Sequence, residues 1–152
     1  MKTFLLLSMF VLNGISAFVS DETPDFITIL TSNVWAPCDR DGKIDDDGIT
    51  KRFRATYDTL VMLLEENGKT QEMTAEYYLS STPDTTFYRS KIGNKQGSYV
   101  IINTSGGNVI LTINSFSENR IEYTFRSNVN NSGKEFIYDS VVVAVKQQSR
   151  DL

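Results

Sequence analysis

The sequence predicts an all-β fold, an antiparallel up-and-down β-barrel of about eight strands with a short helix ahead of the first strand. Along residues 121–126, IEYTFR, apolar and polar side chains alternate strictly, as on a strand with one buried face. Asn67-Gly68 is the dipeptide most typical of a two-residue hairpin turn. The strand-like segments are joined by short links rather than by the long helices that parallel crossovers require, so we expect a meander.

Residues 1–17 have the pattern of a cleaved signal peptide. Residues 4–12 form an apolar run too short to span a bilayer comfortably, and Ile15-Ser16-Ala17 fits a cleavage site, with Ser20 as a later candidate. The alternative is an N-terminal core helix, which would be expected to show an amphipathic pattern that this segment lacks. No lipobox cysteine follows the run. We therefore expect a secreted or periplasmic protein that does not span the membrane, with residues 18–152 as one barrel domain.

A short helix is expected before the first strand. Thr23 would cap it, Pro24 would take its first position, and Asp25 would lie near the positive end of its dipole. The first strand is expected at residues 34–38 and contains Trp35, the only tryptophan of the chain. We expect Trp35 to close one end of the barrel.

The other strands follow from alternation and from turn residues. A long hairpin is predicted with arms at residues 52–65 and 70–79, and a short strand at residues 85–88. Closing such a meander removes its unpaired edges, and an open sandwich is the alternative. The remaining predicted strands are residues 98–103, 108–114, 119–126 and 135–146, the last with Val141, Val143 and Val145 as its inward set.

Composition argues against several classes of function. The formal net charge of −4 leaves no basic stripe for nucleic acid. The chain has no histidine, the usual base of nucleophilic catalysis, and its single cysteine, Cys38, makes a poor nucleophile alone. We therefore expect neither an enzyme nor a cofactor. A lone cysteine cannot form an internal disulfide, which favours a bacterial envelope origin and makes Cys38 either a small buried side chain or a free thiol.

The loop at residues 39–48 is rich in aspartate, whose carboxylate oxygens suit calcium. It does not fit an EF-hand, because aligning Gly42 with the glycine of that loop puts Pro37 and Gly48 where Asp and Glu are required. A solvated acidic loop at the barrel mouth is the favoured interpretation. The candidate metal ligands, if the loop binds an ion, are Asp39, Asp41 and Asp45.

A ligand site is predicted inside the barrel. Tyrosines there would give an apolar wall with a few hydroxyl groups, which suits an amphipathic small molecule. The alternative is that the same side chains simply fill the core. The residues expected to point inward are Met62, Met73, Tyr77, Tyr99, Ile101, Leu111, Ile113, Tyr123 and Phe125.

Parts of the chain resemble lipocalins. Residues 30–35, LTSNVW, are similar to the lipocalin opening, in which a short helix leads into Gly-x-Trp, with Asn33 in place of the glycine. Residues 77–87, YYLSSTPDTTF, and 90–93, SKIG, resemble the small lipocalin-like proteins secreted by Bacteroides-type bacteria. The resemblance implies a barrel in which a basic residue from late in the chain covers the tryptophan. The candidates for that residue are Arg126 and Lys146.

Three functions from different classes follow. The first, which we favour, is a lipocalin-like binder of a small apolar or amphipathic molecule, and it requires a cavity. The second is a protein-partner module, such as an inhibitor or a component of a surface complex, with a filled barrel that acts through its loops. The third is an enzyme with carboxylate chemistry, which would need two converging carboxylates that the inward set does not contain.

Overall fold

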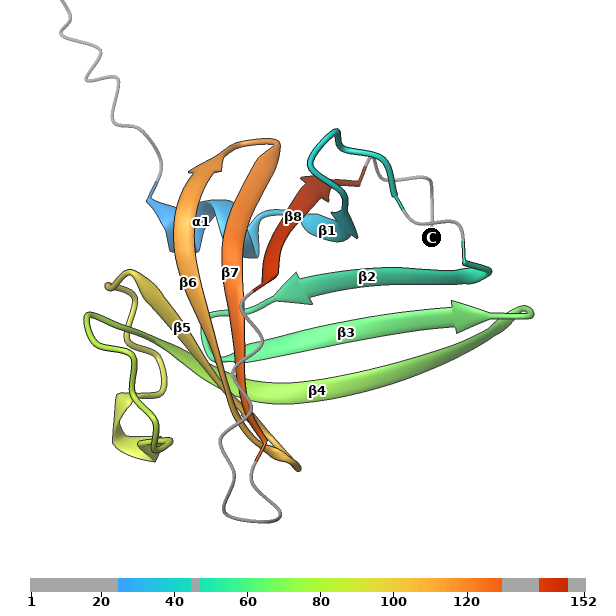
Figure 1. The fold of residues 1–152 in the computed structure, drawn as a ribbon. Coiled ribbons are helices and arrows are strands. Elements are labelled where there is room, and N and C mark those ends of the chain that lie inside the picture. The colour runs from blue at the N-terminus through green and yellow to red at the C-terminus, as the bar shows by residue number, and fades with distance from the viewer. Residues whose placement is uncertain (1–24, 45–46, 130–139, 148–152) are drawn as a thin grey trace, which may run out of the picture.

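The structure is a computed structural model that describes residues 25–44, 47–129 and 140–147. Within these ranges there are one α-helix, one short 3-10 helix and eight strands (Figure 1). In chain order they are α1 (Phe26–Thr31), β1 (Val34–Cys38), β2 (Ile49–Ala55), β3 (Thr59–Glu66), β4 (Lys69–Ser80), η1 (Arg89–Lys91), β5 (Tyr99–Thr104), β6 (Gly107–Ser117), β7 (Arg120–Val129) and β8 (Ser140–Lys146).

The eight strands form one closed antiparallel barrel. Each strand pairs with the next in the chain, and β8 pairs back with β1. This confirms the predicted up-and-down barrel with a short N-terminal helix. Within the described part of the chain, no helix has the length and apolar character needed to cross a membrane.

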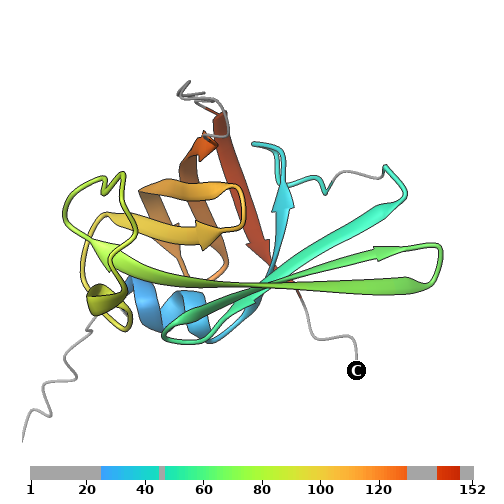
Figure 2. The same cartoon turned by 90° about the horizontal axis from the view of Figure 1, so that it is seen from below.

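The barrel is uneven, because β2, β3 and β4 extend well past the strands on its other side (Figures 1 and 2). β4 pairs with β3 from Lys69 to Glu76, but with β5 only from Tyr77 to Ser80. The first part of β4 therefore leaves β5, and the inner face of the β3–β4 hairpin continues beyond the closed part of the barrel.

The hairpin turn at Asn67-Gly68 is confirmed. Both residues have positive φ, 52° and 71°, as the commonest tight hairpin turn requires. The predicted single arm at residues 52–65 is wrong, because the chain reverses after Ala55. The Thr56 amide donates to the Thr59 carbonyl, and both threonine hydroxyls bond the Asp58 carboxylate, so side chains build this turn without glycine.

The segment between β4 and β5 crosses the outside of the barrel (Figure 1). It contains η1 but no strand at residues 85–88, so that prediction is wrong. Asp84 anchors it: its carboxylate accepts hydrogen bonds from Tyr78 (3.0 Å), Thr82 (2.7 Å) and Lys91 (2.6 Å). Gly97 passes so close to β4 that a Cβ there would lie 2.1 Å from the Ser80 carbonyl oxygen.

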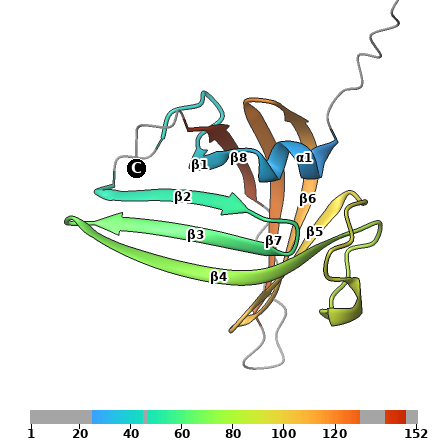
Figure 3. The same ribbon diagram turned by 180° about the vertical axis from the view of Figure 1, so that it is seen from behind.

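Helix α1 lies across one end of the barrel, next to β6 and β7 (Figure 3). Asp25 is its N-cap and accepts from the Thr28 amide, whereas the predicted cap Thr23 and Pro24 lie outside the described residues. Trp35 is fully buried against the helix, and its indole N–H donates to the Leu30 carbonyl at 3.1 Å. The apolar face of α1 supplies Phe26, Ile27, Ile29 and Leu30 to the core.

The inward set predicted for the last strand is wrong. Ile121 belongs to the inner core and pairs with Ala144. Residues directly opposite one another share a face, so Val143, opposite Glu122, and Val145, opposite Arg120, belong to the outer face. Val141 pairs with Thr124 in the register, and its side chain lies outside what the structure describes.

Replacing Trp35 by alanine should lower the free energy of unfolding by about 3–5 kcal/mol, because it leaves a large cavity and an unpaired Leu30 carbonyl. Denaturant titration followed by circular dichroism measures it. Ile44→Ala, at a position 38% exposed, is the control and should change stability by less than about 0.5 kcal/mol. A loss near zero for Trp35→Ala would show that the indole does not close the barrel.

Acid should weaken the Asp84 anchor. Burial by itself raises the pKa of Asp84, but the hydrogen bonds from Lys91, Thr82, Tyr78 and Ser80 outweigh it and hold that pKa at about 2, below the ordinary 3.8. The native state therefore gains stability above the ordinary pKa, and this gain is lost as the pH falls towards about 2.

Thermal unfolding followed at stepped pH values tests this. Asp84→Asn should lower the Tm at neutral pH and make the fall in Tm below about pH 4 shallower than in the wild type. The exposed residue Asp41, as Asp41→Asn, is the matched control. An acid dependence of Tm that is the same in Asp84→Asn and the wild type would contradict this role for Asp84.

Candidate functional site

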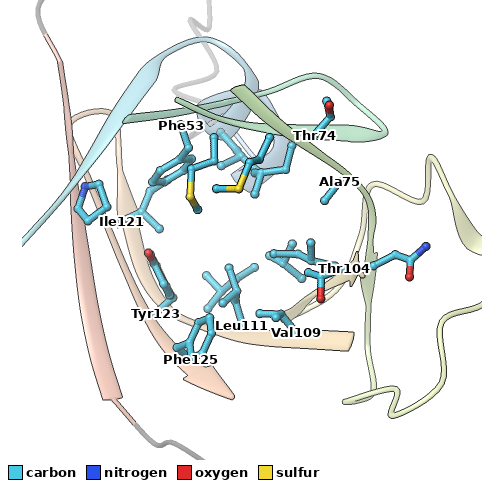
Figure 4. A pocket seen from close by; sticks show the side chains of 18 of the residues that line it. Phe53, Thr74, Ala75, Thr104, Val109, Leu111, Ile121, Tyr123 and Phe125 are labelled. Atoms are coloured by element: carbon cyan, nitrogen blue, oxygen red, sulfur yellow. The ribbon is translucent and has the colours of Figure 1, made fainter. Parts of the chain in front are cut away.

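The barrel contains a cavity of about 540 Å³ that is open to solvent on part of its surface (Figure 4). Its described lining comes from the helix, from β1 to β7 and from the turn after β5, and is mainly apolar. A volume in the range of about 300–1,000 Å³ with mainly apolar walls is typical of sites for small molecules. The barrel is therefore not filled by its own side chains.

The wall on one side is built by alternation on β5, β6 and β7. Leu111 lies between Val100 on β5 and Phe125 on β7, and Ile113 pairs with Tyr123. Figure 4 shows Leu111, Tyr123 and Phe125 on the same side of the hollow, facing Phe53 across it. Because side chains alternate along β7, Ile121, Tyr123 and Phe125 together form one continuous inner surface.

Helix α1 contributes to the closed end of the cavity. Phe26 and Leu30 line it, and Ile121 of β7 adds to the same wall. The Phe26 ring also packs edge-on against Phe116 of β6, with centroids 5.4 Å apart. The short helix predicted from the sequence therefore supplies side chains to the site.

The other end of the cavity carries the polar lining residues and two exposed methionines. Met62 and Met73 are cross-strand partners on β3 and β4 and are 38% and 43% exposed although they line the cavity. They lie where β4 has parted from β5. The polar residues of the lining, apart from Tyr123, are Thr74, Asn103, Thr104 and Ser105.

The structure brings six of the nine predicted inward residues to the cavity lining. Tyr77 points inward but is fully buried in the core, where its hydroxyl donates to the Thr56 carbonyl. Burial and the nearby Asp58 and Tyr57 raise the pKa of Tyr77. The six residues in the lining are Met62, Met73, Leu111, Ile113, Tyr123 and Phe125.

The prediction that Tyr99 and Ile101 point inward is wrong. Ile101 and Tyr99 pack on the outer face with Tyr78 and Ile110, whereas Val100 and Ile102 line the cavity. The segment after β4 covers the outer face of β5, so both faces of this strand are buried and apolar. Its sequence therefore shows no alternation of apolar and polar residues. The lining residues that the sequence prediction missed are Phe26, Leu30, Pro37, Phe53, Leu60, Thr74, Ala75, Val100, Ile102, Asn103, Thr104, Ser105, Val109 and Ile121.

Tyr123 is the polar group in the middle of the apolar wall. It lies between Ile121 and Phe125 on β7, and Figure 4 shows its hydroxyl on the cavity side. Burial, with a smaller effect from Cys38, raises the pKa of Tyr123 to about 12. The hydroxyl therefore stays protonated and neutral at physiological pH.

The acidic loop is held by its own hydrogen bonds where it is described. The Asp39 carboxylate accepts from the backbone amides of Asp41 (3.0 Å) and Lys43 (2.8 Å). Asp45 lies outside the described residues. Among the residues that are described, no group of three or more Cys, Asp or Glu side chains is placed to hold a metal ion.

The register distinguishes the two basic residues considered for covering Trp35. Lys146 is the direct partner of Trp35 on the β1–β8 ladder. Arg126 pairs with Ile110, a residue of the outer cluster, and so lies on the other face of the barrel wall. Asn33 takes the place of the lipocalin glycine without a positive φ, and its amide donates to the Ile29 carbonyl at 3.3 Å.

Comparisons of the chain with protein-family models, with curated proteins and with solved structures found no match. The resemblance to secreted lipocalin-like proteins therefore stays a prediction, and the function has to be argued from the barrel and its cavity.

Proposed function

We propose that this protein is a lipocalin-like carrier that binds one small apolar or amphipathic molecule in its barrel and catalyses no reaction. The observation that carries the proposal is the cavity of about 540 Å³ with its apolar lining. Apolar walls favour a ligand by removing its apolar surface from water, at roughly 25 cal/mol per Å². The preformed barrel reduces the cost of ordering the site on binding.

The entrance that best suits this function lies at the exposed pair Met62 and Met73. Both side chains reach the cavity and the solvent, so they connect the two. Methionine is flexible and polarisable, and it adapts to ligands of different shape. The partner-module alternative presupposes a filled barrel, and the cavity therefore favours the carrier.

Export is part of the proposal. The apolar run and cleavage pattern of residues 1–17 support it, and a carrier of apolar molecules acts in an aqueous compartment where its ligand is poorly soluble. N-terminal sequencing of the protein recovered from the producing cells and from their medium tests it. A start near residue 18 supports export, and a start at Met1 in the cell fraction alone would contradict it.

Filling the cavity should abolish binding. Leu111→Trp places a large ring in the centre of the lumen and should weaken uptake of a lipophilic dye such as Nile red at least about tenfold, because the ring occupies the ligand volume. Fluorescence titration measures the dissociation constant. Thr112→Trp is the matched control, since Thr112 is next in β6 and faces outward opposite Tyr99.

The control should bind the dye as the wild type does. Thermal unfolding of both variants separates loss of binding from loss of fold. Equal dye affinity in a folded Leu111→Trp variant would show that the dye does not bind in the barrel, and no uptake by the wild type would contradict the carrier function.

A further inference from the structure

The hydroxyl of Tyr123, a partly buried residue, differs from those of the two fully buried tyrosines. The hydroxyl of Tyr77 donates to the Thr56 carbonyl, and that of Tyr78 donates to Asp84 at 3.0 Å. Across the described ranges, no group hydrogen-bonds the Tyr123 hydroxyl. This hydroxyl is therefore open to the cavity, and a ligand group that bonds it gains a hydrogen bond inside an otherwise apolar wall.

The residues around this hydroxyl favour an uncharged ligand group over a charged one. The described residues that line the cavity include no Asp, Glu, Lys or Arg. A carboxylate or ammonium brought to Tyr123 would lose its hydration without gaining an opposite charge, which is far more costly than burying a neutral polar group. A hydroxyl or carbonyl group, by contrast, needs one hydrogen bond.

The position of Tyr123 determines where the polar group of a ligand would lie in the barrel. Its neighbours on the wall, Ile113, Ile121 and Phe125, are apolar. The remaining polar lining residues come from β4, from the last two residues of β5 and from the turn after it. Because Tyr123 stays neutral and protonated, its hydroxyl can donate to a carbonyl or accept from an alcohol.

We infer that the ligand is an uncharged amphipathic molecule, an apolar chain or ring system with a hydroxyl or carbonyl group, and that this group hydrogen-bonds the Tyr123 hydroxyl inside the barrel. This inference rests on the proposed carrier function and narrows it from apolar molecules in general to neutral ones with one polar group. It also makes Tyr123 a residue that determines specificity.

Competition for bound Nile red tests the inference with three compounds of equal chain length: decane, decanol and decanoate. In the wild type, decanol should bind about two- to tenfold more tightly than decane, the range expected for one net hydrogen bond, and decanoate should bind more weakly than decanol. In Tyr123→Phe the preference for decanol should disappear. Each dissociation constant is calculated with the dye affinity of the variant in which it is measured.

Tyr99→Phe is the matched control, because it removes the same atom from a tyrosine on the outer face of β5. It should keep the preference for decanol over decane. A preference that survives in Tyr123→Phe, an equal affinity for decanol and decane in the wild type, or tighter binding of decanoate than of decanol would overturn the inference.

The two proposals fail in different ways. If the wild type takes up the dye and decane displaces it, but decanol has no advantage, the carrier function stands and the role of Tyr123 is wrong. If the wild type takes up no dye, both are wrong. Thermal unfolding of Tyr123→Phe verifies that the variant is folded during the titration.

Discussion

The closed end of the barrel depends on the contact between Trp35 and helix α1. A helix of six residues is too short to be stable alone, so its packing against the barrel must hold it in place. The Trp35 indole donates to the Leu30 carbonyl, one of the helix-terminal acceptors that lack an intrahelical partner. One side chain thus satisfies the helix end, fills the base of the core and fixes the residues that line the closed end of the cavity.

A second constraint comes from the two apolar faces of β5. Val100 and Ile102 belong to the lumen, while Tyr99 and Ile101 need a cover on the outside. The segment between β4 and β5 supplies that cover and is tied down by the hydrogen bonds around Asp84. A loop that looks irregular in the sequence is therefore part of the packed structure, and it lets one strand serve both the cavity and the outer cluster.

The cavity has an entrance because β4 leaves β5. Only Tyr77 to Ser80 pair with β5, and the rest of β4 stays with β3. Past this point, the inner face of the hairpin no longer has a strand closing it on that side. Met62 and Met73 consequently line the cavity and are also exposed to solvent. Exposed apolar side chains of this kind are suited to a site that a ligand must enter.

The sequence by itself determined the barrel, its meander order, the Asn67-Gly68 turn and the inner face of β6 and β7, because period-two alternation and turn chemistry are local properties. It also placed Trp35 at the start of the first strand. Sequence did not reveal the reversal after Ala55, because Thr56 and Asp58 form that turn through side-chain hydrogen bonds and contain no glycine or proline.

Only the tertiary structure decided which face of β5 and β8 meets the lumen. Alternation says which residues share a face, but pairing with the neighbouring strand says where that face points. In β5 both faces are apolar, and the register with Leu111 assigns Val100 inward; in β8 the register with Ile121 assigns Ala144 inward. The contributions of Phe26 and Leu30, and the unpartnered hydroxyl of Tyr123 among neutral side chains, likewise arise only when distant segments pack together.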